Sequence, residues 1–502
     1  MTIETETKYE AEADTELPGL DPLPGVAGTR GPDLVQLEAE YYDTADFRLL
    51  RSGITLRRRK GGQDAGWHLK LPAGADSREE IRLPLGRAGR RAPAELANLV
   101  SASTRGRPLE LVASISTLRQ TITVLGQDGE SLAEVADDQV TARPAGSDSA
   151  PIQWREIEVE LTGGGRPLLD AADRLLRQAG VRRSGRSAKL ERVLGGRVPA
   201  PPATTAGPRA AAGEVVQAYL REHAHALVAL DPMVRRRQPD AVHKMRVAAR
   251  RLRSTLQSFG AVIRKQDSEQ LAGELRWLGS VLGAERDAEV QARRLRQLAR
   301  ETDITVLLGP VEARIQAHVA RTAAGSHAAV MAALNSQRYY ALLDVLDELL
   351  SSPPAGSHAS RRARPVMQAA VRYGYRRTRR RLRAAVRQPP GPDRDAALHA
   401  ARKAAKRARY AAEAAIPASG QAARRLARQL KKVQSALGDH QDTVVGRQQA
   451  RQLGIAAQLA GESAFTYGLF YERDACLAAS LQKRAQAEWQ RASRRKYRAW
   501  LG

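Results

Sequence analysis

The sequence predicts an α+β protein of two domains, an N-terminal antiparallel β-barrel with covering helices and a C-terminal all-α domain. Within residues 1–198, short stretches alternate charged and apolar side chains, which is the period of a β-strand. From residue 214 to 502, apolar residues recur at helical spacing, and a linker rich in Pro, Gly and Ala occupies 199–213. Charge divides the chain in the same place: residues 1–200 carry 28 basic and 30 acidic side chains, and the remainder carries 53 and 25. The charge of the C-terminal domain therefore predicts an anionic partner.

The first strand is expected at residues 2–8, where charged and threonine side chains alternate. Glu4, Glu6 and Lys8 then share one face of the strand. Two carboxylates this close repel each other unless a cation lies between them, and ligation by oxygen alone suits Mg²⁺ or Mn²⁺. The motif is therefore a candidate for metal binding by Glu4 and Glu6 and for catalysis together with Lys8, and a polar N-terminal strand without a ligand is the alternative.

The following strands repeat this division into a charged face and an apolar face. In the stretch 54–59, Arg57 and Arg59 share one face and Arg58 takes the other. The same alternation groups further charged side chains on one face of each strand: His68 with Lys70; Arg78 with Glu80 and Arg82; Arg119 with two threonines; Glu134 with Asp138; and Glu156 with Glu158 and Glu160. A closed barrel with these faces inward forms a charged tunnel that accommodates both a metal ion and a phosphate chain.

The motifs ETETK, YYDTADFRLLRSGITLRRR, WHLKLP, REIEVEL and SAKLERVL resemble the CYTH family, the triphosphate tunnel metalloenzymes. The resemblance covers about Met1–Val198. It implies that divalent metal is held by Glu4, Glu6, Glu156, Glu158 and Asp138, with Asp137 as the alternative to Asp138. It also implies that triphosphate is bound by Lys8, Arg57, Arg59, Lys70, Arg119 and Lys189. We place Lys189 on a last strand or its approach, after a packing helix over the barrel at 167–180 that ends at Gly180.

The C-terminal domain is organised around a basic helix at Val242–Leu256. Its residues His243, Arg246, Arg250 and Arg253 fall at i, i+3, i+7 and i+10, which places them on one helical face. The same pattern returns at 398–410, where the matching residues are His399, Arg402, Lys406 and Arg409. Two copies with matching cations indicate an internal duplication that binds a polyanion.

A second pair of segments keeps almost the same offset. Residues 275–290 align with 430–445, so that Leu282-Gly283 matches Leu437-Gly438 and Asp287 matches Asp442. We predict that each basic helix is followed by a helix that ends in Leu-Gly and an acidic turn. The dense arginine run at 361–387 is interpreted mostly as a solvated face, with a further phosphate contact as the alternative.

The motifs VHKMRVAARRLR, LGAERDAEV, LHAARKAAKRARYAAE and LGDHQDTVV resemble the CHAD family over about Gly213 to Trp500. That resemblance implies two four-helix bundles related by a pseudo-twofold axis. It also implies that inorganic polyphosphate binds in the basic groove between them, at the cations named above together with Lys244 and Lys403.

We therefore predict a metal-dependent triphosphatase that hydrolyses inorganic triphosphate or short polyphosphate and binds long polyphosphate. One alternative is a non-catalytic protein that captures polyphosphate and localises to its granules. Another is a tunnel enzyme that acts on thiamine triphosphate or a nucleoside triphosphate, or that cyclises ATP.

The amino-acid composition of the chain narrows the classes of molecule that it is expected to bind. Aromatic residues make up only 4% of the chain, which counts against single-stranded nucleic acid, and no helix-turn-helix or zinc-finger spacing is visible. The single cysteine excludes an intramolecular disulfide framework. The polar N-terminus and the absence of a long apolar run predict a cytoplasmic protein without membrane attachment.

Overall fold

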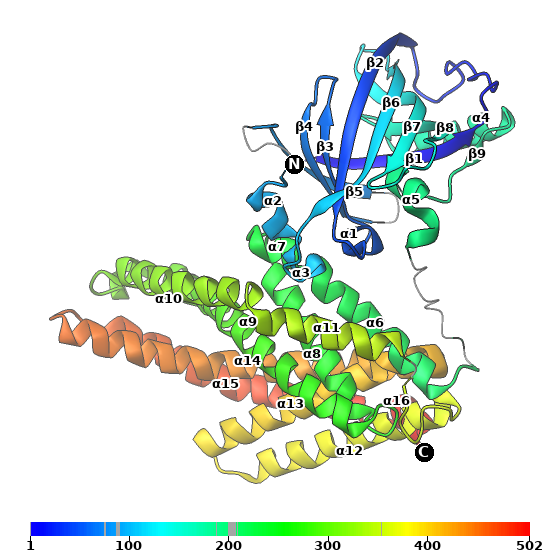
Figure 1. Ribbon diagram of the computed structural model, residues 1–502. Coiled ribbons are helices and arrows are strands. Elements are labelled where there is room, and N and C mark those ends of the chain that lie inside the picture. The colour runs from blue at the N-terminus through cyan, green and yellow to red at the C-terminus, as the bar shows by residue number, and fades with distance from the viewer. Residues whose placement is uncertain are drawn as a thin grey trace. The chain divides into compact units, whose positions relative to one another are not determined.

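The computed structural model describes residues 2–74, 77–86, 91–186, 188–198, 207, 209–352 and 354–502. The chain divides into two compact units, Met1–Pro202 and Ala203–Gly502 (Figure 1). The first is a β-barrel and the second is helical, which confirms the predicted fold class. Most of the expected linker at 199–213 lies outside the described residues, and the first helix of the second unit begins at Ala212 rather than at Glu214.

Eight antiparallel strands close the barrel (Figure 1). Their order is β5-β4-β3-β2-β6-β7-β8-β1, and pairing of β5 with β1 completes the ring. The strands are β1 (Thr2–Ala11), β2 (Gly28–Asp43), β3 (Thr55–Lys60), β4 (Gly66–Pro72), β5 (Ser77–Leu83), β6 (Glu110–Leu125), β7 (Ser131–Pro144) and β8 (Ile152–Leu161). A two-residue strand, β9 (Arg182–Arg183), extends the sheet beside β1.

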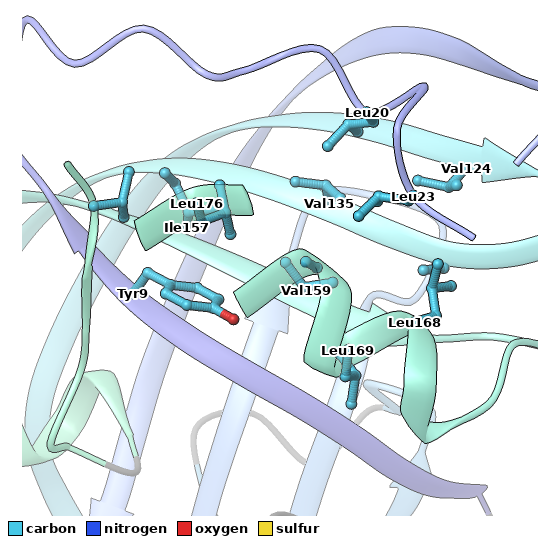
Figure 2. Packing of buried hydrophobic residues seen from close by; sticks show 13 residues of the cluster. Tyr9, Leu20, Leu23, Val124, Val135, Ile157, Val159, Leu168, Leu169 and Leu176 are labelled. Carbon is cyan, nitrogen blue, oxygen red and sulfur yellow. The ribbon is translucent and has the colours of Figure 1, made fainter. Parts of the chain in front are cut away.

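Helices pack against the outer, apolar face of the barrel. Helix α4 (Arg166–Gln178) buries Leu168, Leu169 and Leu176 against Tyr9 and Val159 of the strands (Figure 2). The helix ends before Gly180, whose φ of 85° is a conformation that glycine adopts at little cost, so the predicted packing helix is confirmed. The short helices that complete the unit are α1 (Arg48–Arg51), α2 (Ala94–Leu99), α3 (Ser101–Thr104) and α5 (Lys189–Leu194).

One expectation about the end of this unit is wrong. Lys189 opens the short helix α5 and does not lie on a strand. The reason is the apolar spacing that follows it, because Leu190, Val193 and Leu194 fall at helical intervals and pack into one cluster with Ile115 of the barrel. Helix α5 thereby fixes the backbone from which the Lys189 side chain enters the barrel.

The helical unit contains two sets of helices that pack in the same order. In the first set, α6 (Ala212–Ala229) packs on α8 (Ala241–Ser258), α8 on α9 (Lys265–Arg300), and α9 on α10 (Val311–Leu334). In the second set, α12 (Ala363–Arg387) packs on α13 (Pro392–Ala414), α13 on α14 (Ile416–Leu459), and α14 on α15 (Phe465–Ala492). The remaining α-helices are α7 (Asp231–Arg235), α11 (Gln337–Ser351) and α16 (Arg495–Arg498). The two sets meet where α8 contacts α13 and where α9 contacts α14.

The predicted ends of two helices are also wrong. Helix α9 continues through Leu282-Gly283 and Asp287 to Arg300, and α14 continues through Leu437-Gly438 to Leu459. A single glycine inside a helix costs only about 1 kcal/mol relative to alanine, and the long apolar seams of these helices offset it. Among the described residues, no helix is long and apolar enough to cross a lipid bilayer.

Candidate functional sites

The charged faces of the strands line the inside of the barrel as one continuous surface. The register places Lys8 opposite Glu158, and it places Arg119 opposite Asp138. On the other side of the ring, Arg57 pairs in register with Tyr41, and Lys70 with Glu80. Three of these four register pairs join opposite charges, and the barrel interior is densely ion-paired.

Three carboxylates form the acidic cluster of this interior: Asp138, Glu156 and Glu158. All three are buried, and one oxygen from each lies within 4.8 Å of the others. The ammonium group of Lys189 lies 2.8 Å from Asp138, 2.7 Å from Glu156 and 2.8 Å from Glu158. Burial alone would lower the pKa of Lys189, but these carboxylates outweigh it and raise that pKa well above its usual value.

Arg119 holds the cluster from the β6 side. It donates two hydrogen bonds to Asp138, at 2.7 and 2.6 Å, and one to Glu158 at 2.6 Å. Burial would raise the pKa of Glu158, but Lys189, Lys8 and Arg119 outweigh it and hold that pKa well below its usual value. Burial is likewise outweighed at Asp138, whose pKa is lowered by Lys189 and Arg119. Asp138 and Glu158 are therefore ionised, with cationic side chains in place of bulk solvent.

The donor set of the acidic cluster fits a divalent metal ion. It consists of carboxylate oxygens only, which is the chemistry that Mg²⁺ and Mn²⁺ prefer. The Lys189 ammonium group also shows that a cation is accommodated among these three carboxylates. Asp138, Glu156 and Glu158 are the residues that would hold the ion.

Two of the predicted metal ligands lie outside this cluster. Glu4 pairs with Lys70 at 2.5 Å and with Arg82 at 3.4 Å, whereas Glu6 pairs with Lys8 at 3.1 Å. Lys8 also contacts Glu158 and so joins Glu6 to the acidic cluster. The structure thus brings three of the five predicted ligands together. The other two, Glu4 and Glu6 of β1, lie in the same barrel interior but outside the cluster.

Glu160 is an interior carboxylate to which the sequence analysis gave no role. Burial, together with the nearby carboxylates of Glu4 and Glu6, raises its pKa to about 7. The signal was present in the sequence, because the alternation along β8 places Glu160 on the same face as Glu156 and Glu158.

The sequence left Asp137 and Asp138 as alternatives, and the structure shows which of the two side chains of β7 faces the barrel interior. Asp138 faces inward to Arg119 and Lys189, and it is fully buried. Asp137 faces outward and pairs with Arg155 at 2.7 Å. The position of Arg155 explains this pair, since its guanidinium group also donates to backbone carbonyls of the loop after β1.

The basic wall of the barrel follows the predicted strand phase. Arg57 lies 3.9 Å from Glu80, and Arg59 is buried in contact with Asp64. Burial and the neighbouring guanidinium groups of Arg57 and Arg119 lower the pKa of Arg59 to about 9. Arg58 points the other way and pairs with Glu40 at 3.3 Å. The interior therefore holds more cationic charge on this side than its own carboxylates neutralise.

Two further interior groups were not among the predicted site residues. His68 is buried, and its Nδ1 lies 2.8 Å from Glu80 Oε1. Burial would raise the pKa of Tyr41, but Arg57 outweighs it and lowers that pKa. Tyr41 is an uncharged side chain of β2, so no charge pattern in the sequence singles it out.

In the helical unit, the two predicted stripes lie together. The basic cluster comprises His243, Arg246, Arg250 and Arg253 of α8, and His399, Arg402 and Lys406 of α13. Burial, followed by the charges of Arg250, Arg402 and Arg246, lowers the pKa of Lys406 to about 6. Cations from both helices are therefore close enough to repel one another strongly, which favours an anionic ligand.

The mid-helix glycines position two arginines of the basic cluster. A Cβ on Gly283 would lie 3.1 Å from Nη2 of Arg246, and a Cβ on Gly438 would lie 3.2 Å from Nη2 of Arg402. Each guanidinium group thus lies against the surface of the neighbouring long helix. Arg246 also donates to Asp287 at 2.9 Å.

Three of the predicted polyphosphate-binding residues differ from the rest. Arg409 is buried, pairs with Glu413 at 3.1 Å and lies over the Tyr410 ring, so its charge is compensated within the unit. Lys244 and Lys403 are exposed, outside the cluster of partly buried cations.

Comparison with known proteins agrees with this division. The sequence model of the CYTH domain matches residues 2–192, and that of the CHAD domain matches residues 218–451. An uncharacterized protein of Mycobacterium tuberculosis is 38% identical over 505 residues, which cover 97% of this chain and 95% of that protein.

Two solved structures are similar to part of this chain. A CHAD domain of the plant Ricinus communis is 26% identical, with a TM-score of 0.46, and covers 58% of this chain and 96% of that one. A Hippeastrum protein, described as an adenylyl cyclase with dominant triphosphatase activity, is 14% identical, with a TM-score of 0.23, and covers 40% of this chain and 98% of that one. From the two domain matches and the full-length relative, the chain belongs to the family in which a CYTH domain is followed by a CHAD domain.

Proposed function

We propose that the barrel hydrolyses inorganic triphosphate or short-chain polyphosphate with a divalent metal ion, Mg²⁺ or Mn²⁺, and that the helical unit binds long-chain polyphosphate. One observation carries the first half: the same barrel interior presents three clustered carboxylates and a wall of arginines and lysines. A substrate with several phosphate groups needs both, because cationic side chains bind its oxygens and the carboxylates would hold a metal ion that neutralises its charge.

The interior residues divide this work. Arg57, Arg59 and Lys70 line the wall away from the acidic cluster, where they bind and orient the phosphate oxygens. Arg119 and Lys8 each touch the acidic cluster, so they stabilise charge on the phosphoryl group held beside it. A divalent ion held by Asp138, Glu156 and Glu158 would supply Lewis-acid stabilisation of phosphate oxygens and a water of lowered pKa.

The experiment for the barrel measures phosphate release across a panel of triphosphate, longer polyphosphates, ATP and thiamine triphosphate. Each substrate is tested with Mg²⁺, with Mn²⁺ and with excess chelator. We expect metal-dependent release that is fastest with triphosphate or short polyphosphate. Binding without release of phosphate under any of these conditions would instead identify a protein that only captures polyphosphate.

For the helical unit, the proposal is supported by the mutual repulsion of Lys406, Arg250 and Arg402, which a linear polyanion relieves. Replacement of Arg246, Arg250, Arg402 and Lys406 together by Ala should abolish long-chain polyphosphate binding. Helicity should remain, because the apolar stripes bury α8 and α13 independently of these charges.

Competition between polyphosphate and duplex DNA, at matched phosphate concentration and physiological salt, tests the specificity of this binding. We expect polyphosphate to remain bound. Displacement by DNA would identify a general basic surface rather than a polyphosphate site.

A further inference from the structure

Helix α12 carries a surface that the proposed site leaves out. Its 25 residues include nine arginines and no acidic residue. The arginines from Arg376 to Arg387 are exposed or half-buried, and no ion pair from the described residues reaches them. A helix with so many like charges at i, i+3 and i+4 spacing is destabilised by repulsion, which a bound anion would relieve.

The packing of α12 against α13 connects this surface to the basic cluster. A Cβ on Gly374 would lie 3.0 Å from Cα and 3.1 Å from Cβ of Ala408, so the two helices cross in close contact there. Arg377 lies one turn beyond Gly374, and Arg407 is adjacent to Ala408. The crossing therefore brings these two guanidinium groups into the same neighbourhood.

Arg407 links three helices. Its Nη2 donates to Gln257 of α8 at 2.5 Å, next to the end of the basic stripe on that helix. Burial, followed by the charges of Arg377 and Arg253, lowers the pKa of Arg407. Arg253 is close to Arg250 of the basic cluster in turn, and its buried Nε has no hydrogen-bond partner within the described chain.

We propose that the polyphosphate path does not end at Arg253 of the basic cluster but continues over Arg407 and Arg377 onto α12. This inference rests on the proposed binding of long-chain polyphosphate by the helical unit. From Arg377 to Arg387, α12 adds a path of about 15 Å. The extension makes affinity depend on chain length, because only a chain longer than the cluster reaches α12.

The test uses the full-length chain and a graded series of polyphosphate lengths. The double variant Arg377→Gln/Arg407→Gln removes the connection. The matched control, Arg372→Gln/Arg379→Gln, removes the same charge from the face of α12 opposite Arg377, a face that the proposed path does not use. A third variant, Arg377→Lys/Arg407→Lys, keeps the charge at the connection, and circular dichroism verifies the helicity of all three.

We expect the double variant to weaken long-chain binding about tenfold, as the loss of one or two charge-assisted contacts predicts, and to leave short-chain binding unchanged. The control should retain most of the long-chain affinity, and the lysine variant should recover much of it. Equal loss for short and long chains, or equal loss in the control, overturns the extension while the proposed binding function stands. Failure of the unmodified protein to bind polyphosphate of any length refutes that function and the extension with it.

Discussion

The guanidinium group of Arg246 lies directly against Gly283, one helix away, and Arg402 lies in the same way against Gly438. The duplicated Leu-Gly sequence is therefore not a helix end. It is a gap in the side-chain surface of α9 and α14 that admits one arginine from each basic helix. The two glycines have opposite effects on stability and on binding. They lower the intrinsic stability of the helices, but they leave the space in which the two arginines lie.

Gly283→Ala and Gly438→Ala should each weaken polyphosphate binding by about 1 kcal/mol, because the new methyl group displaces an arginine from its position. The helices should become no less stable, since alanine is the better helix former. Gly279→Ala is the matched control on α9, because a Cβ there meets no atom within 4 Å. Titration with polyphosphate and thermal unfolding measure the two effects, and unchanged affinity in both variants would contradict the positioning role.

Arg57→Ala and Arg59→Ala should each lower kcat/KM by about 10- to 100-fold, the effect of losing charge-assisted hydrogen bonds to a phosphate chain. Arg58→Ala should have a much smaller effect, because Arg58 pairs with Glu40 outside the barrel. Steady-state kinetics on triphosphate compares the three variants. Equal losses would mean that the barrel interior is not the place where substrate binds.

Glu6→Gln should lower turnover by about 100-fold or more, because it removes one of the charges that orient Lys8 beside the acidic cluster. The fold should survive, since the amide still accepts a hydrogen bond from Lys8. Turnover and thermal unfolding of the variant test both statements. Unmodified protein whose turnover withstands excess chelator would contradict the metal requirement itself.

Lys189→Met should destabilise the metal-free barrel by about 3 kcal/mol, because it leaves three buried carboxylates without their shared cation. Added Mn²⁺ should then raise the unfolding temperature more in the variant than in the unmodified protein, since the ion no longer competes with the ammonium group. Calorimetry with and without Mn²⁺ makes the comparison. A metal-induced shift no larger than that of the unmodified protein would exclude the acidic cluster as the ion's site.

Much of the site can be predicted from the sequence because strand alternation fixes which side chains share a face. That rule alone places Arg57 and Glu158 inside the barrel and Arg58 outside, as the ion pairs confirm. Strand alternation cannot show that Glu4 lies outside the cluster of three carboxylates. Alternation gives the face on which a residue lies but not its height along the barrel axis. This height depends on the register between β1 and its neighbours, which pairs Glu4 with Arg78 of β5.

The helical unit shows the same limit in another form. Helical periodicity identifies the stripes of α8 and α13, but a Leu-Gly pair before an acidic residue also suits a helix end, so the sequence predicts α9 and α14 to be too short. Only the packing against Arg246 and Arg402 reveals why glycine is present. The buried pairing of Arg409 with Glu413 is equally hidden, since the duplication alone makes Arg409 equivalent to Arg253.

Polyphosphate binding should take up protons at pH 8, mainly through Lys406. Its pKa in the free protein is about 6, because of burial and the charges of Arg250 and Arg402, so the side chain is neutral at pH 8. A bound polyanion favours the charged form, and affinity should therefore fall as the pH rises above about 6. For the free protein, the unfolded chain binds this proton up to about pH 10.4 and the folded chain does not, so the contribution of Lys406 to stability decreases as the pH falls towards 6.

Isothermal titration calorimetry at pH 8 in two buffers of different ionisation enthalpy measures this proton uptake. His243 and His399 flank the same cations, and their lowered pKa values keep them neutral in the free protein at pH 8. They therefore add to the uptake when the ligand raises those values. Lys406→Met removes the lysine's share of the uptake and leaves that of the histidines. The control Lys244→Met, at an exposed lysine of α8, should leave proton uptake unchanged. Equal proton uptake by the unmodified protein and Lys406→Met would show that Lys406 does not lie on the phosphate path.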